Sequence, residues 1–261
     1  MEQDVTRSKS RWPALILLAM LTGLLALAAL ATRLPRLALW HVVRVCVADA
    51  GLLGVPFPCR QADLAGGKEQ GSVVVQPPLL NDMIVVPTRP LVGVEDAFLQ
   101  TPEAPNYFAA AWRARSLLVS PSGRRPEWDE VALVVNPAMV RTQDQLHIHV
   151  GCLFPRARIA LAAAAPQVPV GAWVRLPEIV PHIAFWGTRV GTSSLSGVAP
   201  FRLAAEALAD RVRERGKLTL MVAGVRVAGA EQFLIVASYA GAPHSWWPIG
   251  NQELIDARCP P

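Results

Sequence analysis

Two histidines separated by a single residue are the side chains in this sequence best suited to chemistry. The segment 145–150 alternates polar and apolar residues, and this period of two predicts a β-strand. On such a strand Gln145, His147 and His149 share one face. Histidine suits nucleophilic or acid–base work near neutral pH, and a strand fixes the direction of its ring. The pattern therefore indicates a catalytic pair, half of a metal site, or an ordinary solvated strand face.

The neighbouring segments predict the elements that hold this strand. Residues 131–136 form an apolar run that ends in Asn136, and a polar turn leads back to the histidines, so we expect two adjacent antiparallel strands. A helix is predicted from the cap Asn106 through about Leu118. Earlier in the chain, short strands are predicted at 72–75 and 83–86.

A similar order of elements follows the histidine segment. Residues 200–216 predict a second helix, and residues 218–238 predict a hairpin. The order helix, strand, strand thus occurs near 106–152 and again near 200–238. This order indicates either a degenerate internal repeat or a coincidence within an α+β fold. The second copy carries no histidine, so we expect its role to be structural.

An uncharged N-terminal block predicts a membrane segment. Residues 12–32 contain no charged side chain, and 21 helical residues span roughly 32 Å, enough for a bilayer core. Three basic residues precede the block and two follow it, which slightly favours a cytoplasmic location for residues 1–11. A cleaved signal peptide is the alternative, but the apolar core of such peptides is usually about 7–15 residues long. We therefore expect an uncleaved anchor, with the rest of the chain exported.

The cysteines agree with export. Cys46, Cys59, Cys152 and Cys259 form an even set without a Cys-x-x-Cys pair. In an oxidising compartment such as a bacterial periplasm they allow two disulfides with three connectivities. Pairing Cys46 with Cys59 is the preferred local choice, and it would leave Cys152 to fasten Cys259 to the histidine strand. Four reduced, buried cysteines are the alternative.

Length and charge set further limits. The 261 residues can bury a sizeable core, and we expect residues 33–71 to form a tether and residues 72–261 to form the folded domain. The net charge is +5, but the basic residues are scattered rather than clustered with aromatic ones. This distribution argues against a nucleic-acid surface.

The histidine segment and its surroundings resemble the histidine-triad (HIT) superfamily of nucleotide hydrolases and transferases. That superfamily has three histidines separated by single apolar residues, and Gln145 stands here in the place of the first. The resemblance implies a HIT-like antiparallel sheet with flanking helices, and the two-part order above raises the prospect of a duplicated HIT-like unit. It also implies that His147 attacks the α-phosphorus of a nucleotide and that His149 hydrogen-bonds the transferred phosphate.

The same resemblance assigns substrate contacts to Asn136, Arg141, Thr142, Gln143 and Gln145. Turn hydrogen bonds are the alternative for Asn136, Thr142 and Gln143, and a solvated side chain is the alternative for Arg141. Gln145 can donate and accept hydrogen bonds but cannot hold a proton. It would keep the geometry while lowering activity, or mark a different leaving group. A neutral imidazole is a competent nucleophile without a metal, so we expect no metal and no cofactor.

A longer match is similar to the bacterial CDP-diacylglycerol pyrophosphatase family, a membrane-anchored branch of that superfamily. It includes the N-terminal anchor, the cysteines, and the segments 101–115 and 199–201. This resemblance implies hydrolysis of CDP-diacylglycerol to CMP and phosphatidate through a phosphohistidine. It also implies a periplasmic catalytic domain held by one span in the inner membrane, next to its lipid substrate.

Three other functions remain open from the sequence. The first is a periplasmic hydrolase or transferase of soluble nucleotides, for which the anchor sets only location. The second is a protein that binds a lipid nucleotide without turnover, with Gln145 reflecting lost catalysis. The third is a metal-binding module built on His147 and His149, although no third ligand lies nearby in the sequence.

Overall fold

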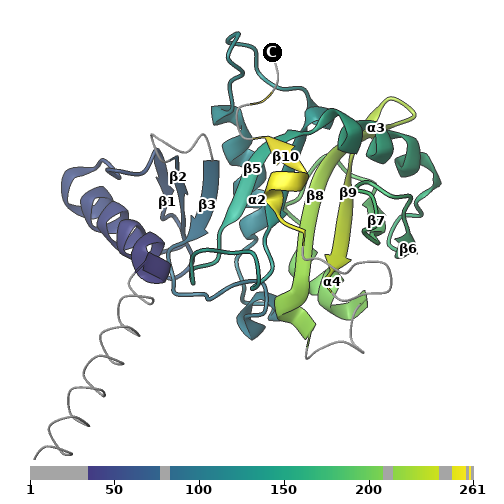
Figure 1. Ribbon diagram of the computed structural model, residues 1–261. Coiled ribbons are helices and arrows are strands. Elements are labelled where there is room, and N and C mark those ends of the chain that lie inside the picture. The colour runs from purple at the N-terminus through teal and green to yellow at the C-terminus, as the bar shows by residue number, and fades with distance from the viewer. Residues whose placement is uncertain (1–34, 77–82, 208–213, 241–248, 257–258, 260–261) are drawn as a thin grey trace, which may run out of the picture.

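The computed structural model describes residues 35–76, 83–207, 214–240, 249–256 and 259. One antiparallel sheet runs through this part of the chain, in the order β1-β2-β3-β5-β4-β8-β9-β7-β6, with β10 paired to β5 (Figure 1). The strands are β1 (Gln61–Asp63), β2 (Ser72–Val75), β3 (Met83–Pro87), β4 (Val131–Val135), β5 (Ile148–Leu153), β6 (Val174–Arg175), β7 (Trp186–Val190), β8 (Leu218–Val227), β9 (Ala230–Tyr239) and β10 (Ile255–Asp256). The predicted α+β class with an antiparallel sheet is confirmed.

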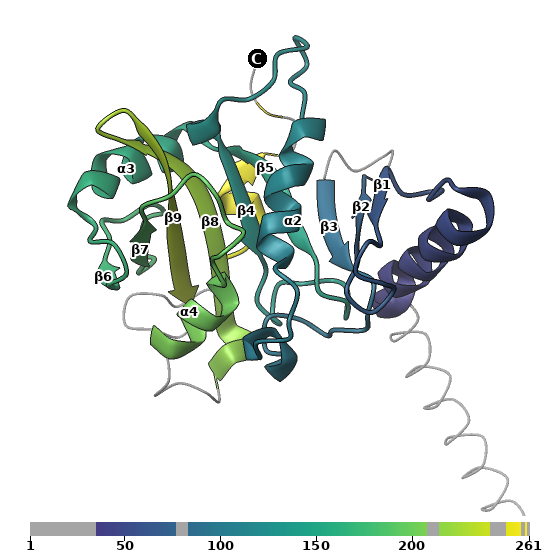
Figure 2. The same cartoon turned by 180° about the vertical axis from the view of Figure 1, so that it is seen from behind.

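Helices cover both faces of the sheet. The structure has a helix over residues 35–53, and then α2 (Tyr107–Ala114), α3 (Pro155–Ala164) and α4 (Pro200–Ala207). The predicted cap of α2 is confirmed, because Asn106 Oδ1 accepts a hydrogen bond from the Ala109 N–H. Helices α2 and α4 lie on one face (Figure 2), where the rings of Phe108 and Phe201 are 4.9 Å apart.

Alternation along β4 fills two cores on opposite sides of the sheet. Leu133 and Val135 pack with α2, whereas Ala132 and Val134 pack with α3 and with the segment around Ile255. This is the period of two that a strand buried on both faces requires. The face that carries α3 is therefore also the face that the C-terminal segment covers.

The helix at 35–53 forms a third core on the face opposite α2. Its buried side chains, Leu39, Val43 and Cys46, pack against Ile84 and its neighbours on β2 and β3. Burying a large aliphatic side chain contributes about 1.5–3 kcal/mol, so this helix is part of the folded domain.

Both predicted strand pairs are confirmed. β4 pairs antiparallel with β5, and β8 pairs with β9 around a two-residue turn. In this turn Ala228 and Gly229 both have positive φ, 50° and 80°, as the common hairpin turn requires. The order α2-β4-β5 recurs as α4-β8-β9, and β4 lies beside β8 at the centre of the sheet. An internal repeat stays a prediction.

The predictions of a membrane span, a tether and two disulfides differ in their outcomes. The expected span at 12–32 lies outside the described residues, and no helix within the described part is both long and apolar enough to cross a bilayer. Residues 33–71, expected as a tether, include the helix at 35–53 and strand β1. The disulfides Cys46–Cys59 and Cys152–Cys259 are both present, as predicted.

Candidate active site

The register of the sheet places the two histidines between the second and third cores. His149 lies opposite Ile84 of β3 and Val134 of β4, and directly opposed residues share one face of a sheet. The ring centroids of His147 and His149 are 4.9 Å apart, and the two ring planes are inclined at 72°. The prediction that both imidazoles share one face is confirmed. The strand itself begins only at Ile148.

A backbone contact sets the tautomer of His147. Its Nδ1 lies 2.7 Å from the carbonyl oxygen of Gln145. A carbonyl oxygen can only accept, so Nδ1 carries the hydrogen, and in the neutral ring the lone pair is then on Nε2. The ring is buried, at 7% exposure, and its orientation is therefore held by the chain just before β5. This is the form that a nucleophilic imidazole needs.

Asn136, which directly follows strand β4, orients the ring of His149. Asn136 Nδ2 donates to His149 Nε2 at 3.2 Å, and Asn136 Oδ1 accepts from the backbone N–H of Asn251 at 2.8 Å. Because a backbone N–H can only donate, the second contact fixes which end of the amide is oxygen. In a neutral ring, His149 then accepts at Nε2 and carries its hydrogen on Nδ1.

Asn251 is a site residue that the sequence analysis missed. Its Oδ1 also accepts from Asn136 Nδ2, at 2.9 Å, so the two asparagines are joined twice. The preceding Gly250 permits this approach, since a Cβ there would lie 3.2 Å from Asn136 Oδ1 and 2.7 Å from a methyl carbon of Val140. No periodicity or motif marks this part of the sequence. The contact arises only when the C-terminal segment folds back over β5.

Gln145 has a structural role next to the histidines. Its Nε2 donates to the carbonyl oxygens of Pro87 and Arg89, at 3.1 and 2.9 Å, and its Oε1 accepts from the Leu91 N–H at 3.4 Å. The side chain is almost fully buried. These three bonds hold the loop after β3 against the chain that precedes His147. A protonated histidine in this position could not accept from Leu91.

Two other predicted substrate contacts, Arg141 and Gln143, are engaged within the protein. Arg141 forms a bidentate pair with Glu95, at 2.6 and 2.7 Å. The amide of Gln143 accepts from the Leu39 N–H and donates to the Pro35 carbonyl, both at 2.9 Å. The turn before the histidines thus binds the first turn of the helix at 35–53.

Asp144 adds further contacts between this turn and the helix at 35–53. Arg36 forms a bidentate pair with it, at 2.6 and 2.7 Å, and the Asp144 N–H donates to the Arg36 carbonyl. The hydrogen bond from Arg36 is the main cause that lowers the pKa of Asp144. Thr142, between these engaged residues, is exposed. It is the one residue of the turn at 141–144 whose side chain is both exposed and without a hydrogen bond in the described part of the structure.

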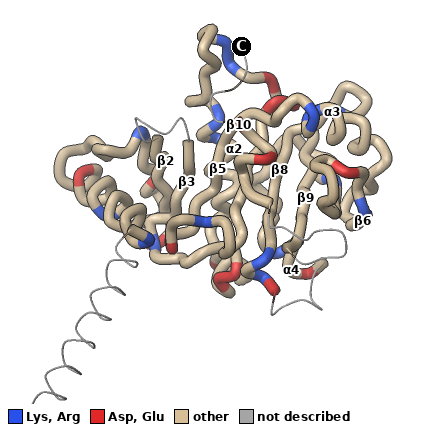
Figure 3. Tube along the Cα trace, viewed as in Figure 1, with Lys and Arg blue, Asp and Glu red and all other residues tan. Residues whose placement is uncertain are grey.

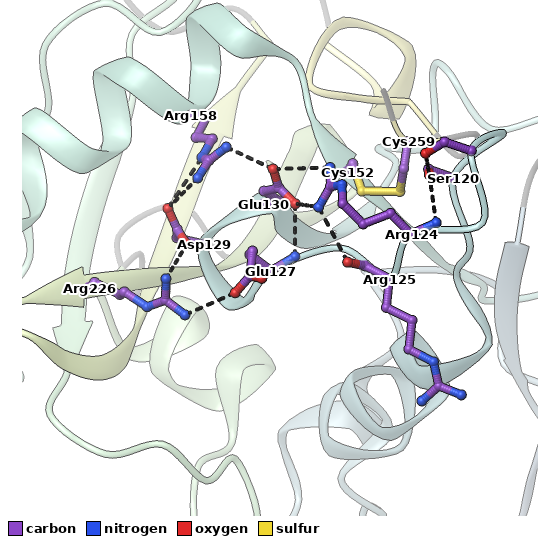
Figure 4. Close-up of polar contacts among 11 residues, drawn as sticks. Ser120, Arg124, Arg125, Glu127, Asp129, Glu130, Cys152, Arg158, Arg226 and Cys259 are labelled. Atoms are coloured by element: carbon purple, nitrogen blue, oxygen red, sulfur yellow. Dashed lines mark hydrogen bonds and ion pairs between the residues drawn. A yellow bond between two sulfur atoms is a disulfide. The ribbon is translucent and has the colours of Figure 1, made fainter. Parts of the chain in front are cut away.

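A charged network supports the other end of β4, far from Asn136. Arg158 on α3 contacts both Asp129 and Glu130, at 2.8 and 2.9 Å, and Arg226 on β8 contacts Asp129 and Glu127 (Figure 4). Burial is the largest single effect on Asp129 and opposes its ionisation. The hydrogen bond from Arg158, a backbone hydrogen bond and the charges of Arg158 and Arg226 together outweigh burial and lower the pKa of Asp129. The disulfide that holds the C-terminal segment to β5 lies beside this network (Figure 4).

The opposite face of the sheet offers weaker chemistry. A hollow of about 180 Å³ near α2 and α4 is lined by Tyr107, Thr101 and Phe201, among others. Burial raises the pKa of Tyr107 to about 12, so its hydroxyl stays protonated at neutral pH. Among the residues that the structure describes, no group of three His, Cys, Asp or Glu could hold a metal ion. The paired histidines are therefore the best candidate for an active site.

The fold and this site define an α+β protein whose antiparallel sheet carries a buried histidine pair, completed by an asparagine from the C-terminal segment. Comparison with known families gives a more specific assignment. The chain belongs to the CDP-diacylglycerol pyrophosphatase family, whose model matches residues 35–260.

Relatives that carry the same family name match this chain over most of their length. A CDP-diacylglycerol pyrophosphatase of Yersinia pestis is 30% identical over 208 residues, which cover 78% of this chain and 76% of the relative. A probable CDP-diacylglycerol pyrophosphatase of Mycobacterium leprae is 29% identical over 255 residues, covering 94% and 90%. A third relative, from Mycobacterium bovis, is 28% identical over 226 residues, covering 86% and 83%.

Proposed function

We propose that this protein hydrolyses the pyrophosphate bond of CDP-diacylglycerol to CMP and phosphatidate, with His147 as the nucleophile. Family membership supports the substrate and the reaction. The single structural observation that supports the nucleophile is the hydrogen bond from His147 Nδ1 to the Gln145 carbonyl. It leaves Nε2 as the atom with the lone pair.

The reaction would proceed in two displacements at one phosphorus atom. The Nε2 lone pair attacks the cytidylyl phosphorus, and the bond to the bridging oxygen breaks, so that phosphatidate leaves with that oxygen and its electron pair. A water molecule then attacks the phosphohistidine, loses a proton to solvent, and releases CMP with the free imidazole. The ring is positively charged in the intermediate, and the Nδ1–H bond to the Gln145 carbonyl becomes stronger as that charge develops.

His149 would stabilise the transferred phosphate. With Nε2 accepting from Asn136, the neutral ring carries a hydrogen on Nδ1, which can donate to a phosphate oxygen. Asn136 acts through this ring and Thr142 is the exposed candidate for a direct contact, while Arg141 and Gln143 act by holding the turn. We also propose that the sheet is HIT-like and that Gln145 preserves the geometry of the first histidine of that family.

We further propose an inner-membrane location with the catalytic domain in the periplasm. Two disulfides support an oxidising compartment. The apolar block at 12–32 supports an anchor.

The test follows the transferred phosphorus in the full chain, assayed in detergent on CDP-diacylglycerol labelled at the cytidylyl phosphate. Wild type is expected to release labelled CMP and to retain label when quenched during turnover. His147→Ala should do neither, while the control His182→Asn, at an exposed histidine with positive φ, should match wild type. Equal turnover by His147→Ala would contradict the nucleophile. Substrate binding without turnover by folded wild type would favour the binding-protein alternative, and turnover of soluble CDP-alcohols alone would favour a soluble-nucleotide hydrolase.

A further inference from the structure

The outward face of the helix at 35–53 is apolar, although it faces away from the protein. The inward residues Leu39, Val43 and Cys46 are buried against the sheet. The exposed positions on the other side fall at helical spacing, and most of them are aliphatic: Leu37, Ala38, His41, Arg44, Val45, Ala48 and Leu52. A helix on the surface of a water-soluble domain normally has a polar outer face. This helix therefore has a second apolar surface that the described part of the chain does not cover.

The apolar surface continues into the loop that follows the helix. Leu52 and Leu53, at the end of the helix, are 82 and 69% exposed, and Val55 and Phe57, in the loop, are 59 and 70% exposed. The Cys46–Cys59 disulfide closes this loop onto the helix, so the four side chains stay together at one end of the domain. Single exposed apolar residues are common, but a contiguous patch marks a surface that contacts another apolar phase.

Charges near this surface are few and mainly basic. Along the helix the charged positions are Arg36, Arg44 and Asp49, and Arg60 follows the loop (Figure 3). Arg44 and Arg60 are exposed, whereas Arg36 is paired with Asp144 and Asp49 is half-buried. Exposed arginines beside an apolar stripe match anionic lipid headgroups. The charge pattern therefore favours a bilayer over a protein surface as the occupant.

We propose that the outward face of this helix, including Leu52 and Leu53, and the loop at 54–57 lie in the surface of the bilayer. The helix of 19 residues would run along that surface for roughly 29 Å, directly after the uncharged block at 12–32, which ends three positions before residue 35. The inference rests on the proposed function for its meaning, because a lipid-bound helix brings the enzyme to a lipid substrate.

This placement explains how the histidines would reach a headgroup. The inward face of the helix packs on Ile84, which lies opposite His149. The first turn of the helix is bonded to Gln143 and Asp144, just before His147. The site would thus be held about the thickness of one helix, roughly 10 Å, from the bilayer surface. The helix is then a rigid spacer, and it does not touch the substrate phosphates.

A crosslinking experiment tests the contact itself without using activity. The full chain is placed in lipid nanodiscs at one copy per disc, with a photoreactive benzoylphenylalanine at Phe57, at Val45, or at the control position Ile159 on α3, which is equally exposed at 70%. Lipid adducts detected by mass spectrometry at positions 57 and 45, but not at 159, are expected. Absence of lipid adducts at position 57, or adducts to a second protein copy in crowded membranes, would overturn the proposal.

A kinetic experiment separates this surface from the active site. Leu53→Ser/Phe57→Ser should lower turnover of vesicle-embedded CDP-diacylglycerol about tenfold, equivalent to about 1.4 kcal/mol of lost surface binding, and leave turnover in detergent unchanged. The control Ile159→Ser/Val170→Ser, at exposed apolar positions elsewhere, should change neither. An equal loss in vesicles and in detergent would overturn the proposal. Failure of the proposed function would instead remove turnover from wild type in both assays and leave the crosslinks unaffected.

Discussion

Asn136 and Asn251 lie 115 positions apart in the chain, yet they are joined by two hydrogen bonds, one in each direction. The same Asn136 amide also donates to His149. The orientation of a candidate catalytic ring is therefore determined by the C-terminal segment, through a residue at the end of β4. Metal-binding and catalytic imidazoles commonly depend on such a neighbouring group for their orientation and tautomer.

Removing the Asn136 amide should impair catalysis more than stability. We expect Asn136→Ala to lower kcat roughly 10- to 100-fold, which is about 1.4–2.7 kcal/mol of transition-state stabilisation, because His149 loses the donor that orients its ring. Steady-state kinetics on CDP-diacylglycerol in detergent would measure this change. Asn251→Ala keeps the hydrogen bond from the backbone N–H of residue 251 to Asn136, so we expect kcat to fall only a few-fold. An Asn251→Ala loss as large as that of Asn136→Ala would show that the side chain of Asn251 has a role of its own.

Gln145 should be a stabilising residue rather than one that takes part in proton transfer. In Gln145→Glu, an ionised carboxylate cannot donate to the carbonyls of Pro87 and Arg89 and would repel both. We expect a loss of about 1–3 kcal/mol in the free energy of unfolding, measured by urea denaturation. The activity of the fraction that remains folded should fall only modestly. A pH–rate profile that gains a new ionisation with unchanged stability would contradict this role.

The disulfide Cys152–Cys259 should support catalysis as well as stability. It closes a loop with a sequence separation of 107, and in the chain-entropy model a loop of this size contributes about 4.7 kcal/mol. Cys152→Ala/Cys259→Ala should lower both the unfolding midpoint and kcat, because the segment that carries Asn251 is then less firmly held.

The other disulfide provides the matched control. Cys46–Cys59 has a separation of 13, for which the same model gives about 3 kcal/mol. Cys46→Ala/Cys59→Ala should lower stability while kcat in detergent stays close to wild type. Equal losses of kcat in the two double variants would argue against a specific effect through Asn251.

The stability that the ion pair between Arg36 and Asp144 gives to the fold should depend on pH in a defined direction. The pKa of Asp144 is lowered from its ordinary value of 3.8, so the folded state binds this proton less readily than the unfolded state. The stabilisation of the folded state by the Arg36–Asp144 ion pair is then complete above pH 3.8, and it is lost as the pH falls through the lowered pKa of Asp144.

Asp144→Asn tests this dependence. The variant should be less stable than wild type at neutral pH by about 0.2–1 kcal/mol, the range for partly exposed ion pairs. The difference should shrink below pH 3.8 in thermal denaturation. Arg36→Gln should give the same pH profile, and a difference that grows in acid would contradict the assignment.

Local patterns in the sequence were sufficient for the strands and their faces. Strict alternation before Val150 predicted that His147 and His149 share a side, because a strand's side chains have a period of two. The hairpin around Gly229 and the cap at Asn106 were equally predictable, since each depends on residues within a few positions.

Contacts between distant segments were not predictable in this way. Residues 33–71 were expected to form a tether, whereas burial of Leu39 and Val43 against the sheet makes the helix at 35–53 part of the domain. The roles of Gln143 and Asn251 depend on partners about 100 positions away or more. Neither residue type specifies such a partner locally, because a polar side chain can be satisfied by many backbone groups.

The way the C-terminal segment covers β5 determines when during synthesis the site can be complete. Asn251, β10 and Cys259 are all made after every strand that surrounds the histidines, and chains fold from the N-terminus as they emerge. The nascent protein would hold both imidazoles long before it holds the residues that orient them. On the proposed mechanism, a chain that is still being made would lack the contact that orients His149, and turnover would begin only after residue 251 has been made and packed.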